Sequence, residues 1–134
     1  MRIVAGDWRG RSIKAPQGET TRPTADRTRE TLFNMLASRL GSFEGLSVAD
    51  LFAGSGALGL EALSRGCASC LFVEEDKRAI DAIRANIAAL DARPRCSIQQ
   101  ASVLRLGPAK VPHDLILLDP PNDTNPGVVA IDRL

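Results

Sequence analysis

Short apolar runs recur along the second part of the chain and predict strands. They lie at 48–52, 71–73 and 115–118, and a weaker one is centred on Ile98. The run at 115–118 is apolar throughout, which is typical of a strand that is buried on both faces of a sheet. We therefore expect four strands in this part of the chain.

Two of the intervals between these strands show helical patterns. Residues 58–65 follow a glycine-rich turn, and 77–90 carry an apolar residue at every third or fourth position. The apolar residues of the second helix are Ile80, Ile83, Ile87 and Leu90. This alternation predicts an α/β fold with a parallel, doubly wound sheet, and such sheets bind ligands at the carboxyl ends of their strands.

The first 41 residues follow a different pattern. Ile3-Val4 and Ser12-Ile13 flank 6–10, where two glycines permit a tight reversal, so we expect a β-hairpin. After a polar connector, a helix is predicted with Thr24 as its N-cap and Gly41 at its end. The chain is therefore divided into a hairpin and helix arm at 1–41 and a body at 46–134.

Composition limits the class of protein. The chain has 134 residues, of which 44% are hydrophobic and 25% are charged. These values fit one globular domain and argue against a disordered chain, collagen or a coiled coil. No apolar run approaches the ~20 residues of a membrane-spanning helix, and the first residues contain no signal-peptide core. We expect a monomeric, cytoplasmic protein without a membrane partner.

The three cysteines are too few for a disulfide scaffold. Cys67 and Cys70 form a C-x-x-C pair, but this pair precedes a strand, whereas redox pairs open a helix. A zinc site would need further ligands, and only Cys96 and His113 remain. We expect the cysteines to be small buried hydrophobic residues, and we expect no metal site.

The net charge of +1 conceals an asymmetry. Residues 1–40 carry eight basic and four acidic side chains, a net charge of +4, whereas 41–134 have a net charge of −3. A basic arm on an acidic body suits a polyanionic partner such as a nucleic acid. A solvated arginine-rich surface is the alternative, and charge alone does not distinguish the two.

A glycine-rich turn lies between the first strand of the body and the next helix. It runs from Asp50 to Gly59, and Gly54 and Gly56 within it allow the backbone to approach a ligand closely. The amino end of the following helix favours negative or polar groups. The pattern G-x-G-x-x-G also matches a dinucleotide fingerprint, which carries little weight alone.

An acidic cluster ends the second strand. Glu74 follows Gly54 by twenty residues, the spacing at which a carboxylate accepts hydrogen bonds from a ribose diol. Its neighbours Glu75 and Asp76 are better explained as groups that complement the dipole of the helix beginning at Lys77.

The last predicted strand ends in Asp119-Pro120-Pro121. Proline fixes φ and has no N–H, so this stiff loop presents carbonyl oxygens and the Asp119 carboxylate as acceptors for the protons of an amine. Alone, the motif is better explained as a turn that ends a strand. In register with the two preceding motifs, it is better explained as a site.

Together these motifs resemble class I S-adenosylmethionine-dependent methyltransferases that act on exocyclic amines. They are Asp50-x-Phe52-x-Gly54-x-Gly56-x-x-Gly59, the acidic end of the second strand, and Asp119-Pro120-Pro121. The arm narrows the resemblance. Arg2-Ile3-Val4-x-Gly6 and Arg22-Pro23-Thr24-x-Asp26-Arg27-x-Arg29-Glu30 are similar to the bacterial small-subunit (16S) ribosomal RNA guanine-N2 methyltransferase family.

The resemblance implies a Rossmann-like methyltransferase sheet and S-adenosylmethionine as the cofactor. In this family, Asp50 would hold the amino group of the cofactor and Glu74 its ribose. The implied cofactor-binding residues are Asp50, Phe52, Ala53, Gly54, Ser55, Gly56, Gly59, Glu74, Glu75 and Ser102. The implied catalytic residues are Asp119, Pro120 and Pro121, which would hold the target amine.

The implied reaction is direct in-line methyl transfer to N2 of a guanine that has left its stack or pair. The implied partner is 16S rRNA or the assembling small ribosomal subunit. The candidate phosphate contacts in the arm are Arg9, Arg11, Lys14, Arg22, Arg27 and Arg29. Trp8 could stack on a base, but we favour a role in packing the hairpin onto the body.

The chain departs from the family pattern in three respects. Asn122 stands where an aromatic residue usually stacks on the target base, and Ser102 stands where an acidic residue usually contacts the adenine. Only thirteen residues follow Pro121, so we expect the usual seven-stranded sheet to lack its C-terminal strands.

Three other functions are compatible with part of this pattern. An NAD-dependent dehydrogenase shares the glycine turn and the ribose acid, but it does not explain the Asp119 loop or the basic arm. Methylation of adenine N6 in DNA or RNA would use a similar loop. A non-catalytic RNA-binding fragment would use the arm alone.

Overall fold

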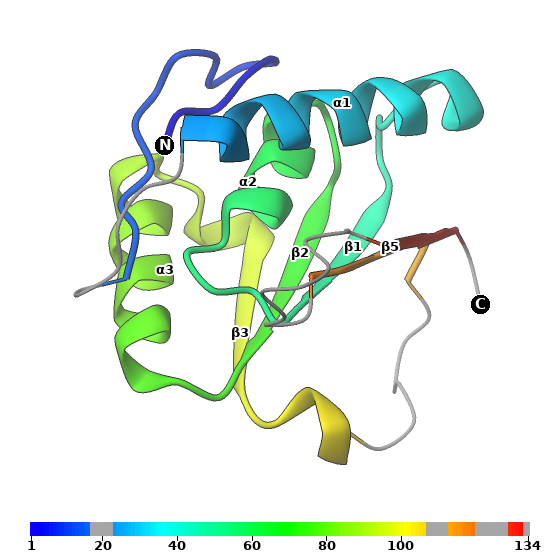
Figure 1. The fold of residues 1–134 in the computed structure, drawn as a ribbon. Coiled ribbons are helices and arrows are strands. Elements are labelled where there is room, and N and C mark those ends of the chain that lie inside the picture. Colours follow the sequence, from blue (N-terminus) through cyan, green and yellow to red (C-terminus); the bar gives the residue numbers. More distant parts are fainter. Residues whose placement is uncertain (17–22, 107–112, 120–128, 133–134) are drawn as a thin grey trace.

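The computed structural model describes residues 1–16, 23–106, 113–119 and 129–132 (Figure 1). Its centre is a five-stranded sheet in the order β3-β2-β1-β4-β5. The strands are β1 (Ser47–Leu51), β2 (Ser69–Glu74), β3 (Cys96–Gln100), β4 (Leu115–Leu118) and β5 (Val129–Asp132). The four strands predicted from the sequence are confirmed, and they pair in parallel.

The fifth strand was not predicted. β5 pairs antiparallel with β4, from Leu118↔Val129 to Leu115↔Asp132, so the sheet is mixed rather than parallel throughout. A four-residue run such as this one is too short for periodicity to separate a strand from a loop. The order of the other strands reverses direction between β1 and β4, which is the switch point expected of a Rossmann-like, doubly wound sheet.

Of the three α-helices, α2 (Ala57–Ser64) and α3 (Lys77–Ala89) pack against the sheet, and α1 (Pro23–Leu40) lies above α2 and shares the same core (Figure 1). Two short 3₁₀ helices, η1 (Arg93–Arg95) and η2 (Val103–Arg105), flank β3. In the described ranges, no helix has both the length and the apolar character needed to cross a membrane.

The first residues of α1 and α3 show which residue types begin these helices. α1 begins at Pro23, so Thr24 lies inside the helix instead of capping it. Proline is favoured in the first turn because its missing N–H would have no intrahelical partner there. Asp76 caps α3 as expected, since its carboxylate accepts a hydrogen bond from the N–H of Ala79 (3.2 Å).

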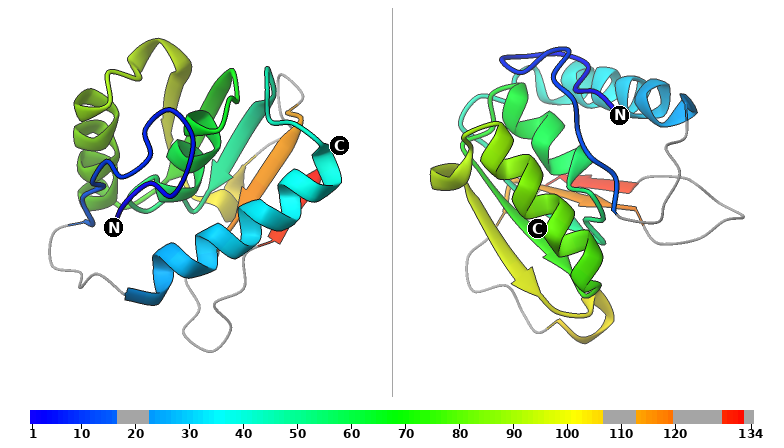
Figure 2. Two further views of the ribbon diagram at one scale, coloured as in Figure 1. Left: turned by 90° about the horizontal axis from the view of Figure 1, so that it is seen from above. Right: turned by 90° about the vertical axis from the view of Figure 1, so that its left-hand side faces the viewer.

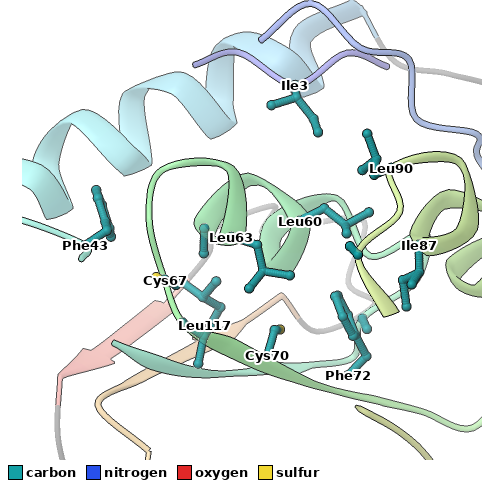
Figure 3. Close-up of a cluster of buried hydrophobic side chains, with 14 of the residues drawn as sticks. Ile3, Phe43, Leu60, Leu63, Cys67, Cys70, Phe72, Ile87, Leu90 and Leu117 are labelled. Carbon is teal, nitrogen blue, oxygen red and sulfur yellow. The ribbon is translucent and has the colours of Figure 1, made fainter. Parts of the chain in front are cut away.

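The helices and the strands share one hydrophobic core (Figure 3). Leu60 and Leu63 of α2 lie in its middle, with Phe72 on the sheet below them. Gly59 permits this close packing: a Cβ at Gly59 would lie 2.5 Å from the Phe72 ring and 2.6 Å from Sγ of Cys70. α2 can therefore lie directly on β2 only because position 59 has no side chain.

The cysteines belong to this core rather than to a reactive site. Cys67 and Cys70 are 0% and 2% exposed, as predicted, and Cys96 is half-buried. All three are free thiols, and burial raises the pKa of Cys67 to about 12 and that of Cys96 to about 11. Such thiols are weak nucleophiles at neutral pH. Within the described residues, no group of three or more His, Cys, Asp or Glu side chains could hold a metal ion.

The N-terminal hairpin is confirmed, and it is packed into the body. The N–H of Ile3 donates to the carbonyl of Arg11 (2.9 Å), and the N–H of Gly10 donates to the carbonyl of Ile3 (2.8 Å). Ile3 and Ile13 are buried in the same core as Phe33 of α1. The hairpin and α1 accordingly lie together above α2 (Figures 1 and 2). The arm and the body thus share one core.

The hairpin docks on a buried carboxylate of α2. Glu61 is 0% exposed, and its Oε1 accepts hydrogen bonds from the N–H of Val4 (2.9 Å) and from Nε of Arg29 (3.0 Å). Its Oε2 accepts from the N–H of Ala5 (3.1 Å) and from Nε of Arg65 (3.0 Å). Four donors, two of them cationic, offset the cost of burying this charge.

The tip of the hairpin meets the carboxyl end of α2 at Gly6. The N–H of Asp7 donates to the carbonyl of Ser64 (2.8 Å), and Oγ of Ser64 donates to the carbonyl of Ala5 (2.6 Å). Gly6 has φ +88°, and a Cβ placed there would lie 1.9 Å from the carbonyl oxygen of Ser64. Only glycine allows this approach.

We expect Gly6→Ala to lower the free energy of unfolding by about 1–3 kcal/mol more than Gly10→Ala does, because it adds overpacking. Gly10 is a matched control: it has φ +80°, and no described atom lies within 4 Å of its added Cβ. Both variants share the cost of a left-handed alanine, about 1–2 kcal/mol. Urea denaturation followed by Trp8 fluorescence measures the difference, and equal losses would contradict the docked hairpin.

Candidate active site

Four strand ends meet at the carboxyl edge of the sheet. Glu74 ends β2, where it pairs with Gln100 of β3, and Ser102 follows β3. Leu51 at the end of β1 pairs with both Val73 and Leu118. The structure therefore brings the predicted residues to one edge, in the order Ser102, Glu74, the glycine-rich turn and Asp119.

The glycine-rich turn leaves β1 through an unusual backbone conformation. Phe52 has φ +59°, a left-handed value that costs a non-glycine residue about 1–2 kcal/mol. Backbone hydrogen bonds hold the turn after it: the N–H of Ala53 donates to the carbonyl of Val73 (3.0 Å), and that of Gly56 donates to the carbonyl of Ala53 (2.8 Å). Strain of this kind is concentrated at functional sites in proteins.

The three glycines of the turn have different surroundings. Added Cβ atoms at Gly56 and Gly59 would lie 3.3 Å and 2.5 Å from the Phe72 ring, so these two glycines allow close packing. At Gly54, which has φ +58°, no described atom lies within 4 Å of the added Cβ. The space in front of Gly54 is therefore open, unlike that at Gly56 and Gly59.

Asp50 places a buried carboxylate beneath the turn. It is 1% exposed, and its Oδ2 accepts a hydrogen bond from the N–H of Gly59 (2.9 Å). Its Oδ1 is also buried, and the described residues offer it no hydrogen-bond partner. The pKa of Asp50 is raised to about 8, chiefly by desolvation and to a smaller extent by the charges of Asp119 and Glu74, against the lowering effect of the Gly59 hydrogen bond. An ammonium group at Oδ1 would supply the missing donor and favour the ionised carboxylate.

Glu74 holds the turn from the next strand. Its Oε1 accepts from the N–H of Gly54 (2.9 Å), and its Oε2 accepts from the N–H groups of Glu75 (3.0 Å) and Asp76 (2.9 Å). A carboxylate has about four acceptor positions, so about one is left for a hydroxyl group. The Glu75 side chain is exposed.

The sequence reasoning missed Asn86. This residue of α3 is 2% exposed, and its Nδ2 donates to the carbonyl of Ser55 in the turn (2.9 Å). A signal was present, because Asn86 lies on the apolar side of α3, between Ile83 and Ile87. A polar residue at such a position needs hydrogen-bond partners when it is buried.

Asp119 is exposed at the end of β4. It lies close enough to Asp50 for its charge to raise the pKa of that carboxyl. Four residues singled out from the sequence lie outside the described residues, namely Pro120, Pro121, Asn122 and Arg22.

The basic residues of the arm fall into two groups. Arg9, Arg11, Lys14 and Arg27 are exposed, and Nη2 of Arg11 also donates to the carbonyl of Ala89 at the end of α3 (2.8 Å). Arg29 is only 3% exposed; besides Glu61 it contacts Asp26 (2.9 Å) and the carbonyl of Arg2. The prediction that Arg29 contacts phosphate is therefore wrong, because its guanidinium is buried and already pairs with the carboxylates of Glu61 and Asp26.

Trp8 packs on the body, the alternative that we favoured from the sequence. Its ring lies under the guanidinium of Arg95, 5.4 Å from the ring centroid, and its backbone N–H donates to Oγ of Ser64 (3.0 Å). The side chain is half-buried. Trp8 thus contributes to holding the hairpin on the body.

Comparisons with known proteins agree with this geometry. A family model described as "Conserved hypothetical protein 95" matches residues 1–133. The chain belongs to this family. Its relatives include "Putative rRNA methyltransferase YlbH" of Bacillus subtilis, 40% identical over 125 residues, and "Ribosomal RNA small subunit methyltransferase D" of Escherichia coli, 41% identical over 121 residues. The resemblance noted from the sequence is thereby confirmed.

A solved structure confirms the fold of this family member. The E. coli protein "Putative methyltransferase yhhF" superimposes with a TM-score of 0.77 at 38% identity, covering 90% of this chain and 64% of that one. The alignments with the B. subtilis and E. coli relatives each cover 90% of this chain, but only 66% and 60% of the relatives. The chain thus spans less than two thirds of the length of these proteins.

The raised pKa of Asp50 predicts a pH dependence of stability. Between its unfolded pKa of 3.8 and its folded pKa of about 8, the folded state holds a proton that the unfolded state has lost. The free energy of unfolding should therefore fall by up to ~1.4 kcal/mol per pH unit over this range, and this contribution should level off above about pH 8. Asp50→Asn cannot titrate, but it can still accept from Gly59.

Urea denaturation of the wild type and of Asp50→Asn at pH 5, 6.5 and 8 tests this prediction. The difference in the free energy of unfolding between the two proteins should change steadily in favour of the variant as the pH rises. A difference that is constant with pH would show that Asp50 has an ordinary pKa.

Proposed function

We propose that the protein transfers the methyl group of S-adenosylmethionine to N2 of a guanine in small-subunit ribosomal RNA. The observation that carries this proposal is the buried Oδ1 of Asp50, which has no hydrogen-bond partner among the described residues, beside the open position in front of Gly54. A cofactor that carries an amino group fits this arrangement. Relatives named as rRNA methyltransferases support the substrate class.

In this proposal the cofactor lies along the carboxyl edge of the sheet. Asp50 accepts hydrogen bonds from its amino group, the backbone at Gly54 lies along its methionine part, and the remaining acceptor position of Glu74 takes a ribose hydroxyl. Ser102, one strand further along, lies on the adenine side. When bound, S-adenosylmethionine supplies a methyl group on a positively charged sulfur as the electrophile.

Asp119 has the proposed role of holding the target amine. The lone pair of guanine N2 is delocalised into the ring, which makes N2 a poor nucleophile. Hydrogen bonds from its N–H groups to the Asp119 carboxylate and the Pro120 carbonyl would localise the pair and direct it at the methyl carbon. The N–C bond forms as the C–S bond breaks, and one N2 proton leaves through Asp119 to water.

The RNA surface in this proposal is smaller than the sequence suggested. Arg9, Lys14 and Arg27 are exposed and available for phosphate contacts. Arg11 is exposed as well, but its guanidinium already donates a hydrogen bond to the backbone at the end of α3. Arg22 remains a candidate from the sequence. Because the arm shares the core of the body, these contacts would lie at a fixed position relative to the site.

Methyl transfer by Asp119 variants tests this proposal. Asp119→Ala is expected to lower the transfer rate by about 10²-fold or more, the usual cost of losing a group that stabilises developing charge. The affinity of this variant for S-adenosylhomocysteine should stay within about threefold of the wild type, because Asp119 does not contact the proposed cofactor. The loss of its negative charge favours the ionised form of Asp50, which is the form that binds an ammonium group. Asp81→Ala, an exposed aspartate of α3, is the matched control and should retain full activity.

The assay uses labelled S-adenosylmethionine with naked 16S rRNA, assembled small subunits and DNA, and mass spectrometry identifies the modified base. N2-methylguanine in rRNA is the expected product. N6-methyladenine would support the alternative methyltransferase instead. RNA binding with no transfer to any substrate would support a non-catalytic fragment, and equal loss of binding and transfer in Asp119→Ala would refute the assigned role.

A further inference from the structure

Asn86 connects two parts of the chain that are far apart in the sequence. Its Oδ1 accepts a hydrogen bond from the backbone N–H of Lys14 (2.8 Å), and its Nδ2 donates to the carbonyl of the same residue (3.0 Å). The other proton of Nδ2 goes to the carbonyl of Ser55 (2.9 Å). One buried side chain thus holds both the end of the hairpin segment and the glycine-rich turn.

The amide suits this position because of its donor and acceptor pattern. Two donors face two carbonyls, and one acceptor faces one N–H, so the orientation of the group is fixed by its partners. An isosteric carboxylate would keep the contact with the N–H of Lys14. It would place oxygen against the carbonyls of Lys14 and Ser55, where nothing could be donated unless the carboxylate took up a proton.

The peptide that Asn86 holds is central to the turn. The carbonyl of Ser55 and the N–H of Gly56 belong to one peptide plane, and that N–H donates to the carbonyl of Ala53 (2.8 Å). The plane is therefore fixed at both ends. This fixed peptide adjoins Gly54, whose own N–H is held by Oε1 of Glu74, so Asn86 restricts the turn directly next to the open space at Gly54.

We infer that Asn86 is a positioning residue that couples the end of the arm at Lys14 to the cofactor turn at Ser55. This inference rests on the proposed function, since it assumes that a cofactor binds at the turn. A ligand that stabilises the turn then also stabilises the arm, and by linkage the docked arm strengthens binding of the ligand. Lys14 is an exposed candidate for RNA contact, so cofactor binding would order part of the RNA surface.

Hydrogen exchange of the Lys14 amide, with and without saturating S-adenosylhomocysteine, tests the coupling in the 134-residue chain. In the wild type, the ligand should slow this exchange at least about fivefold, the lower end of ordinary coupling between sites. Asn86→Asp should lose this ligand-induced protection and bind S-adenosylhomocysteine about tenfold more weakly. Calorimetry gives the affinity, and circular dichroism reports whether the variant is folded.

Ile87→Val is the matched control, because Ile87 is the next residue of α3, is buried in the core, and has an apolar side chain that forms no hydrogen bond to Lys14 or Ser55. It should lose some stability but keep the protection and an affinity within about twofold. If residue 86 had only a structural role, Asn86→Asp would likewise lose stability but keep the ligand-induced protection of the Lys14 amide. Protection that persists in Asn86→Asp therefore overturns the inference.

The wild-type measurement decides the question even if Asn86→Asp does not fold. Binding of S-adenosylhomocysteine without a change at the Lys14 amide refutes the coupling and leaves the proposed function intact. Failure of the wild type to bind S-adenosylhomocysteine refutes the proposed function, and the inference with it.

Discussion

The buried carboxylate of Glu61 is the interaction on which the rest of the arrangement depends. It lies in α2, is fully buried, and accepts hydrogen bonds from two backbone N–H groups of the hairpin, from Arg29 of α1 and from Arg65 of α2 itself. An ion group of this kind adds little stability compared with an apolar core of the same shape, but removing one partner leaves a buried charge unpaired. Its effect is to specify one docking position for the arm.

The short helix α2 thereby serves two regions at once. Its amino end carries the glycine-rich turn, and its middle and carboxyl end carry Glu61 and Ser64, which hold the hairpin. Because Gly59 has no side chain, α2 packs directly on β2, so α2 cannot shift without disturbing the sheet. The basic surface and the carboxyl edge are thus fixed relative to each other by a helix of eight residues, which suits the proposed transfer of a methyl group from a bound cofactor to an RNA base.

The local patterns of the sequence were sufficient for the four parallel strands, the three α-helices and the residues at the sheet edge, but not for the antiparallel β5. Asp50 lies one residue before the end of β1, Glu74 ends β2 and Asp119 follows β4, and strand order alone brings such positions together. The contacts that hold these parts were not predictable in this way. Arg29 pairs with Glu61 across 32 residues, and Asn86 reaches Lys14 across 72. The basic arm contains no signal that separates the buried Arg29 from the exposed Arg9, Arg11 and Arg27. Periodicity likewise does not predict the left-handed backbone conformation of Phe52.

Calorimetric titration at pH 7 with S-adenosylhomocysteine and with NAD measures whether Asp50 receives the amino group of the proposed cofactor, S-adenosylmethionine. Because the pKa of Asp50 is about 8 before binding, an ammonium group at Oδ1 should expel its proton. We expect S-adenosylhomocysteine to bind with release of about one proton, measured in buffers of different ionisation enthalpy, and we expect NAD not to bind. Binding of NAD, or of S-adenosylhomocysteine without proton release, would contradict this assignment.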